Sequence, residues 1–341
     1  MNNVKYSIIV PTLNQSRKLH QCLYRLSVLS FDPRMFEVLI IDNGSSDDTK
    51  DVSLSFQGKI MNWRYLYCAS HGLMAARHMG CDKAQGQMLS YIDDDSLVDK
   101  NWLSGIDDAF KQEGVALVGG PCIPEYEGTP PDWIEYFWNQ TPSGRVHYFL
   151  SLVDFGDEVL LIDPRNVFGC NYSIRKKIFL ELGGTHPDYY PEKYRYFQGD
   201  GESGLTTKIQ NANYKAIYHP KAKICHLIPR ARLTVDYFCW RRYFNGIHAS
   251  YSFVRRQYGV DDAVVQEKDG ILRRILRRSK TLIGLRLHQD EPEEIKRIRE
   301  KIQQSYESGY QDHQKEIKNN PVLIEWILRK NYLGENARLP V

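Results

Sequence analysis

Short apolar runs alternate with segments of helical spacing through the first hundred residues. Runs rich in β-branched residues predict strands, and leucines or alanines that recur every three or four residues predict helices. The predicted strands are 6–11, 36–43, 62–68 and 88–93, and the predicted helices are 16–30 and 71–86. Helices of this length between strands form βαβ units. We therefore expect an α/β fold with a Rossmann-like, mostly parallel central sheet flanked by helices.

The pattern loosens beyond residue 120. A segment rich in Pro, Gly and aromatic residues, 124–150, comes well before a helix and two short strands predicted over 199–227. Helices dominate from about residue 230 onward. We expect an α/β domain over residues 1–227 and a helical C-terminal region over residues 228–341.

Polar residues end three of the four predicted strands. They are Pro11 and Thr12, Asp42, and the run Asp93, Asp94 and Asp95. Ligands of parallel sheets bind at the edge formed by the carboxyl ends of the strands. Three adjacent carboxylates repel one another, so a fold that gathers them needs a cation or hydrogen-bond donors nearby. The sequence predicts a ligand site with positive charge at this edge.

Charge is distributed unevenly along the chain. Residues 1–226 carry 23 Lys and Arg against 27 Asp and Glu, a net charge of −4, whereas residues 227–341 carry 22 against 15, a net charge of +7. The basic residues lie without the fold signals that accompany nucleic-acid recognition, so we expect no nucleic-acid partner. The 42% apolar and 26% charged composition is that of an ordinary globular protein.

The seven cysteines are scattered and form no C-x-x-C pair, which disfavours both a disulfide framework and a zinc cluster. The N-terminal apolar run is too short for the core of a signal peptide, and no stretch approaches the ~20 apolar residues that span a bilayer. We expect a cytoplasmic protein, with contact at the inner face of the membrane left open.

Five segments, in this order, resemble the inverting family 2 glycosyltransferases of the GT-A fold: SIIVPTLNQ, VLIIDNGSSDDT, AARHMGCDKAQGQMLSYIDDDSLVDKNWL, FGCNYSIRK and GDGESGLTTKIQNANYKAIYHPKAKICH. The resemblance covers roughly residues 5 to 227. It implies transfer of a sugar from a nucleotide-sugar donor, most simply a UDP-sugar, to a hydroxyl of a glycan or lipid-linked glycan, as in cell-surface polysaccharide synthesis.

Such a reaction needs a divalent cation on the diphosphate and a base for the acceptor hydroxyl. By resemblance, Asp95 binds Mn²⁺ or Mg²⁺, and Asp93 or Asp94 contacts the donor ribose and the water molecules on the metal. His226 occupies a position where this fold often supplies another metal ligand. The structural alternative for the acidic run is an N-cap of the helix that begins near Asp99, which explains one carboxylate rather than three. The structural alternative for His226 is a buried histidine whose hydrogen bonds are made within the protein.

The resemblance places Asp42 against the nucleotide base, with Pro11 and Thr12 in the same pocket. A carboxylate accepts well from the N–H of uracil. Arg77 resembles the family arginine near the base and the diphosphate. The alternatives are that Asp42 only caps its turn and that Arg77 is an exposed helix residue paired with an acid.

The catalytic base departs from the family pattern. Counting back from Leu205, the positions of the family's E-D pair hold Gly201 and Glu202. This makes Glu202 the expected base, with Asp200 as its rival.

Three further residues are candidates for binding sugars. Asn171 lies where the family binds the donor sugar, but it could equally be a buried structural amide. Trp133 and Trp138, with neighbouring aromatic residues, could stack on acceptor sugars or could belong to the core.

The C-terminal region is outside the resemblance. Paired arginines among aromatic residues in 228–259 either close over a diphosphate or pack a helix; they are Arg230, Arg232, Arg241 and Arg242. Segment 270–288 predicts a basic amphipathic helix, which either contacts a membrane surface or packs against acidic residues that follow it. The two last predicted helices pack together or form a homodimer interface.

Two other enzyme classes are disfavoured, the sugar-1-phosphate nucleotidyltransferases and the dinucleotide-dependent oxidoreductases. Both would show a glycine-rich phosphate-binding loop after the first strand, and this sequence has none there. An inactive GT-A relative that binds glycan or acts as a scaffold is the remaining alternative. Only the departure at Gly201 and Glu202 favours it.

Overall fold

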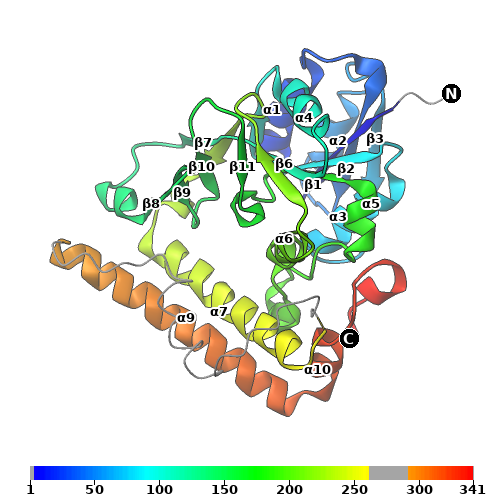
Figure 1. The fold of residues 1–341 in the computed structure, drawn as a ribbon. Helices are drawn as coiled ribbons and strands as arrows, with labels where there is room; N and C mark the ends of the chain where they lie inside the picture. The colour runs from blue at the N-terminus through cyan, green and yellow to red at the C-terminus, as the bar shows by residue number, and fades with distance from the viewer. Residues whose placement is uncertain (1–3, 261–290, 341) are drawn as a thin grey trace.

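The computed structural model describes residues 4–260 and 291–340, and it contains two β-sheets above a layer of C-terminal helices (Figure 1). The larger sheet has eight strands. In spatial order they are β11 (Leu160–Ile162), β13 (Lys215–Tyr218), β6 (Val115–Gly119), β12 (Asn171–Arg175), β4 (Met88–Ile92), β1 (Tyr6–Thr12), β2 (Phe36–Asp42) and β3 (Trp63–Tyr67).

The central strands of this sheet are apolar because both of their faces are covered. Every residue of β1, β2 and β4 is buried, as expected for parallel strands between two layers of helices. β4, β1, β2 and β3 are parallel to one another, whereas β12 runs antiparallel to both β4 and β6. The α/β architecture predicted from the sequence is therefore confirmed, with a mixed sheet.

Helices cover both faces of the larger sheet and form one hydrophobic core on each. α1 (Ser16–Ser27) and α4 (Trp102–Phe110) pack on one face, and α3 (Leu73–Lys83), α5 (Lys176–Glu181) and α6 (Gly201–Asn211) pack on the other. The remaining short helices are α2 (Thr49–Leu54), η1 (Pro33–Met35), η2 (Asp132–Phe137), η3 (Pro164–Asn166), η4 (Glu192–Phe197), η5 (Arg230–Arg232) and η6 (Gly334–Ala337).

The second sheet brings a late strand next to the acidic run. Its six strands, in spatial order, are β5 (Ser96–Val98), β14 (Ile224–Ile228), β7 (Cys122–Tyr126), β10 (Leu152–Asp154), β9 (Gly144–His147) and β8 (Asn139–Thr141). β14 pairs with β5 so that His226 lies opposite Ser96. This pairing places His226 beside Asp95, which is distant in sequence. The predicted domain boundary after residue 227 falls on this last strand and stays a prediction.

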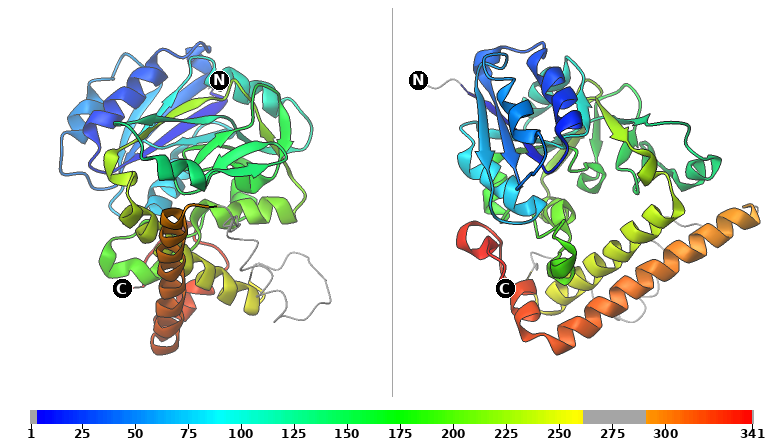
Figure 2. Two further views of the ribbon diagram at one scale, coloured as in Figure 1. Left: turned by 90° about the vertical axis from the view of Figure 1, so that its left-hand side faces the viewer. Right: turned by 180° about the vertical axis from the view of Figure 1, so that it is seen from behind.

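The C-terminal layer consists of α7 (Val235–Gln257), α9 (Glu293–Asn319) and α10 (Pro321–Ile327). α7 and α9 lie side by side and run in the same direction (Figures 1 and 2). Glycines make their close crossing possible, since a Cβ on Gly246 would collide with the Tyr306 carbonyl and one on Gly309 with the Tyr243 carbonyl.

The end of the described chain packs against the α/β part. Trp326 donates from Nε1 to the Phe197 carbonyl at 2.8 Å, and the Tyr332 carbonyl accepts a hydrogen bond from His78 Nδ1 at 2.9 Å. Tyr251 of α7 hydrogen-bonds Tyr332 through its hydroxyl at 2.8 Å. The C-terminal layer therefore contacts α3 directly, one residue from Arg77.

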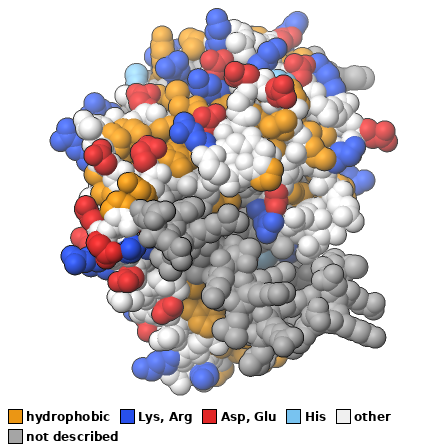
Figure 3. Space-filling view, turned by 60° about the vertical axis from the view of Figure 1, so that its left-hand side comes forward, with side chains coloured by type: hydrophobic (Ala, Val, Ile, Leu, Met, Phe, Trp, Pro, Cys, Tyr) orange, Lys and Arg blue, Asp and Glu red, His pale blue; other side chains and the backbone are white. Residues whose placement is uncertain are grey.

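Two predictions about surfaces stay open. The amphipathic segment 270–288 lies outside the described residues, and no second chain is present to test a homodimer. Within residues 4–260 and 291–340, no helix has the combination of length and apolar character needed to cross a bilayer. On the face shown in Figure 3, acidic and basic side chains are interspersed rather than gathered by sign.

Candidate active site

The acidic run lies where β4 ends, next to the end of β1. Thr12 donates from its hydroxyl to Asp94 Oδ2 at 2.7 Å. Burial, together with the charge of Asp95, raises the pKa of Asp94 to about 8. The surroundings of Asp94 therefore favour its protonated form.

Asp95 has the opposite electrostatic environment. Its Oδ1 lies 3.4 Å from His226 Nε2, and its Oδ2 lies 3.2 Å from the Arg232 guanidinium. Burial alone would raise the pKa of Asp95, but His226 and Arg232 outweigh it and hold this pKa well below its usual range. Asp95 is ionised although its side chain is only 6% exposed.

The tautomer of His226 follows from its second contact. His226 Nδ1 lies 3.0 Å from the Leu150 carbonyl, which can only accept, so Nδ1 carries a proton. Arg232 lies 3.3 Å from Nε2. Nε2 of His226 therefore faces the Asp95 carboxylate, and a neutral ring in this orientation would present the Nε2 lone pair to a cation bound between them.

This arrangement fits a divalent cation. Asp95 Oδ1 is buried without a hydrogen bond, and a carboxylate with a neutral imidazole suits Mn²⁺ or Mg²⁺. The backbone carbonyl on the far nitrogen of His226 fixes the ring, as is typical of metal-binding histidines. No three acidic, His or Cys side chains converge within the described chain, so a cation here would take its other ligands from the diphosphate and water.

Arg77 is the centre of a second cluster. It is 3% exposed, and its guanidinium lies 3.2 Å from Glu202, 3.6 Å from Asp93 and 3.7 Å from Asp188. Gly169 leaves room for it, since a Cβ at that position would collide with Arg77 Nη2. Burial disfavours the charge, yet the carboxylates outweigh burial and raise the pKa of Arg77. The alternative of an exposed arginine is therefore wrong.

Glu202 lies in the first turn of α6 and remains accessible. Its Oε2 accepts from Arg77 Nη1 at 3.2 Å, its Oε1 accepts from the Gly169 N–H at 3.3 Å, and its side chain is 27% exposed. Burial raises the pKa of Glu202, but Arg77 and the backbone donors outweigh it, and the net pKa is lowered. An ionised and accessible carboxylate can accept a proton.

Asp200 is fully engaged by other residues. Oδ1 lies 2.6 Å from His186 Nδ1, and Oδ2 accepts from the Ser252 hydroxyl at 2.6 Å. Asp200 occupies the N-cap position of α6, and Ser252 belongs to α7. This network fixes the start of the helix that carries Glu202.

Asp42 takes the turn-capping role. Its Oδ1 accepts from the N–H groups of Gly44 and Ser45, and its Oδ2 accepts from the Tyr65 hydroxyl at 2.6 Å. Asp42 nevertheless lies opposite Thr12 in the sheet register, at the same edge as the acidic run. Pro11 is buried within β1.

The three sugar-binding candidates lie in structural positions. Asn171 is 1% exposed, and it accepts from Trp102 Nε1 at 2.9 Å and donates to the Ala222 carbonyl at 2.8 Å. Trp133 packs edge-on against Phe238, with ring centres 4.9 Å apart. Trp138 lies under the Arg145 guanidinium, 4.6 Å from its ring centre. Asn171 therefore matches the alternative of a buried structural amide, since both its polar atoms bond within the protein, and the sugar contacts of Trp133 and Trp138 stay predictions.

Sequence reasoning missed Asp188. Burial raises the pKa of Asp188, the charge of Arg77 opposes this, and the net pKa is raised to about 7. Asp188 Oδ1 has no hydrogen bond. Asp188 stands in THPDYYP, which matches no motif, so only its contact with Arg77 identifies it.

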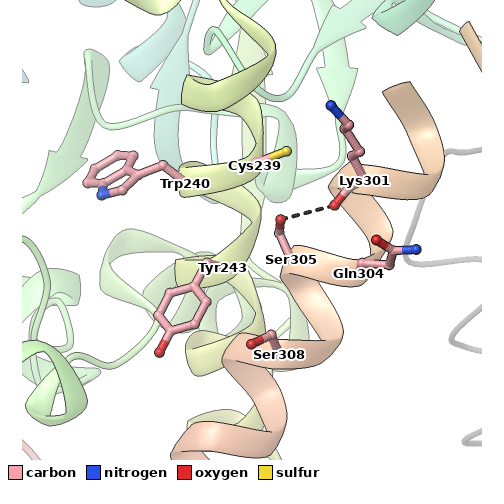
Figure 4. Close-up of a pocket in the computed structure, with 7 residues that line it drawn as sticks. All are labelled: Cys239, Trp240, Tyr243, Lys301, Gln304, Ser305 and Ser308. Atoms are coloured by element: carbon pink, nitrogen blue, oxygen red, sulfur yellow. Dashed lines mark hydrogen bonds between the residues drawn. The ribbon is translucent and has the colours of Figure 1, made fainter. Parts of the chain in front are cut away.

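A separate hollow of about 540 Å³ lies between α7 and α9 (Figure 4). It is lined by Cys239, Trp240, Tyr243, Lys301, Gln304, Ser305 and Ser308. None of the clustered carboxylates lines this hollow, so it is not the candidate active site.

Comparison with known proteins decides the family. Residues 7–183, more than half of the chain, match the family described as glycosyl transferase family 2. The chain belongs to this family. It is 23% identical to the glucosyl-dolichyl phosphate glucuronosyltransferase of Haloferax volcanii over 285 residues. This aligned stretch covers 82% of this chain and 87% of that protein. The predicted enzyme class, glycosyltransferase, is confirmed.

Two other proteins are similar to this family 2 glycosyltransferase. The GalNAc(5)-diNAcBac-PP-undecaprenol beta-1,3-glucosyltransferase of Campylobacter jejuni is 33% identical over 129 residues, 36% of this chain and 40% of that protein. The structure of a mannosyltransferase from Pyrobaculum calidifontis, in complex with GDP-Man and Mn²⁺, has a TM-score of 0.56 at 15% identity and covers 96% of this chain and 84% of that one. This likeness confirms the GT-A type fold.

Proposed function

We propose that this family 2 glycosyltransferase transfers a sugar from a UDP-sugar to a hydroxyl of a glycan or lipid-linked glycan, with inversion at the anomeric carbon and dependence on Mn²⁺ or Mg²⁺. The observation that carries the proposal is the buried pair Asp95 and His226, whose Oδ1 and Nε2 atoms lie 3.4 Å apart. Arg77 and Glu202 lie on the other side of Asp93.

Asp95 and His226 are the groups that would hold the cation. When bound there, a divalent cation supplies positive charge that stabilises a diphosphate leaving group. The Pyrobaculum mannosyltransferase, whose structure contains Mn²⁺ and a nucleotide sugar, supports this use of the site. Asp42, with Pro11 and Thr12 in the same pocket, is the proposed contact of the nucleotide base, and Asp93 or Asp94 is the proposed contact of the ribose and of water molecules on the cation.

Glu202 is the proposed base. Arg77 lowers its pKa and so favours the ionised form, and its side chain, 27% exposed, is accessible to an acceptor hydroxyl that gives up its proton as it attacks. Arg77 and the Gly169 N–H hold the carboxylate in one orientation. A single displacement on the face opposite the leaving group gives inversion. Asp200 is proposed to position α6 rather than to accept the proton, because its side chain is less exposed than that of Glu202, 15% against 27%, and is held by His186 and Ser252.

Two relatives support a lipid-linked acceptor. The Haloferax and Campylobacter enzymes are named for transfer to glucosyl-dolichyl phosphate and to GalNAc(5)-diNAcBac-PP-undecaprenol, respectively. We extend this acceptor class to the present chain.

Calorimetric titration of UDP, GDP, CDP and dTDP, each with and without Mn²⁺, tests the proposal. We expect binding of UDP that requires Mn²⁺. Metal-dependent binding of GDP instead would retain the enzyme and change the donor nucleotide. No binding of any nucleotide by folded protein would overturn the proposal and favour a scaffold role.

A further inference from the structure

Arg241 of α7 is held by two residues with uncommon backbone conformations. Its Nη1 donates to the Tyr189 hydroxyl at 3.1 Å, and its Nη2 donates to the Ser151 hydroxyl at 3.4 Å. Ser151 and Tyr189 have φ angles of +54° and +50°. The other non-glycine residues with positive φ in the described chain are Asn14 and Asn213, and asparagine adopts this conformation readily. Backbone strain of this kind clusters at functional sites.

The strained residues adjoin the two sides of the candidate active site. Ser151 follows Leu150, whose carbonyl fixes His226. Tyr189 follows Asp188, which contacts Arg77. Arg241 therefore lies between the metal side and the base side, within electrostatic range of Glu202.

The charge of Arg241 has no carboxylate partner among residues 4–260 and 291–340. Arg77 and Arg232, in contrast, both form ion pairs with carboxylates of the site. The two hydroxyls that Arg241 contacts are neutral and use only two of its five N–H groups. A guanidinium in this state binds phosphate well, because its planar set of donors matches two phosphate oxygens.

Aromatic rings extend from this position along α7. Trp240 is 47% exposed, is stacked on Tyr237 with ring centres 5.9 Å apart, and meets Phe244 edge-on at 4.9 Å. Figure 4 shows the Trp240 ring extending from α7 on the side away from α9. Tyr189, held by Arg241, is 55% exposed. Exposed aromatic faces suit sugar rings and apolar chains.

We propose that Arg241 binds the phosphate of an acceptor in which a sugar is joined to an alkyl chain through phosphate, with Tyr189 and Trp240 contacting the groups on either side. This inference rests on the proposed function and specifies its acceptor. The donor diphosphate belongs to the side of Asp95 and Arg232. Arg241 lies between that side and Glu202, to which the attacking hydroxyl must come.

The test compares two acceptor analogues that differ in the phosphate. Glucosyl citronellyl phosphate is the charged probe, and citronellyl glucoside, which has the same sugar and alkyl chain, is the neutral one. Calorimetry with UDP and Mn²⁺ present should show that Arg241→Gln weakens binding of the charged probe by about 10-fold or more and leaves the neutral probe unchanged. Arg256→Gln, an exposed arginine on the same helix, is the matched control and should bind the charged probe like the wild type.

The remaining outcomes separate the two proposals. Arg241→Gln should bind UDP with Mn²⁺ normally, which also shows that the variant is folded. Loss of UDP binding would assign Arg241 to the donor and overturn the inference. Equal binding of the charged probe by wild type and variant would overturn it as well, while the proposed function stands on UDP binding. Failure of the wild type to bind any nucleotide would instead remove the proposed function.

Discussion

On one side of the active site two groups that can bind a metal, Asp95 and His226, face each other; on the other side a single cation, Arg77, is surrounded by three carboxylates. The base side therefore contains its own permanent positive charge. On the metal side, the guanidinium that pairs with Asp95 is that of Arg232, a 32% exposed side chain on a short 3-10 helix. The difference supports the proposal that the metal side receives a cation with its ligand, whereas the base side already contains its cation.

Removing the charge of Asp95 should have the largest effect. In Asp95→Asn, His226 would be left without an ionised partner, and we expect Mn²⁺-dependent binding of UDP to weaken by about 100-fold or more. Isothermal titration calorimetry measures this affinity. Asp51→Asn, at an exposed position on α2, is the control and should bind normally. Undiminished metal-dependent binding in Asp95→Asn would remove Asp95 from the metal site.

Removing the charge of Glu202 should spare the metal side. We expect Glu202→Gln to bind UDP and Mn²⁺ like the wild type and to lose kcat by ~10²-fold or more, because the amide cannot accept the acceptor proton. Single-turnover kinetics with saturating donor separates the two effects. If turnover stays near the wild-type value while Asp200→Asn abolishes it, the base is Asp200.

The smallest effect concerns stability and sharpens the description of the base side. The pKa of Asp188 is raised in the folded state to about 7, mainly by burial, so the folded state holds this proton more tightly than the unfolded state. The resulting stabilisation is present below the ordinary pKa of aspartate and is lost as the pH rises through about 7. Asp188→Asn should therefore flatten the fall in melting temperature between about pH 5 and about pH 8 by a few degrees. Differential scanning calorimetry of wild type and variant over this pH range tests the prediction. An equal change of melting temperature with pH in both proteins would contradict it.

The sequence was informative wherever a short local pattern of residues determines the structure. β1, β2 and β4 were predicted within a residue or two because buried parallel strands are continuous apolar runs. The meeting of Asp95 and His226 agrees with the family resemblance, although the role of both residues stays a proposal.

The sequence was uninformative wherever distant segments meet. Arg77 lies on a helix whose residues are buried on nearly every side, so helical periodicity gave no sign that it is interior. Ser252 reaches Asp200, and Arg241 reaches Ser151, only through the packing of α7 on the α/β part. Asn171 has the right chemistry for a sugar contact, but its strand turns it inward.

The hydrogen bond between His78 and Tyr332 has a consequence for how the enzyme is made. The two residues are 254 positions apart, so at ~5–20 residues per second a ribosome synthesises α3 roughly ten to fifty seconds before it reaches Tyr332. During that interval the helix that carries Arg77 lacks one of its packing partners. Translation products that stop before Tyr332 would carry every proposed catalytic side chain and still lack the hydrogen bond that joins this helix to the C-terminal segment.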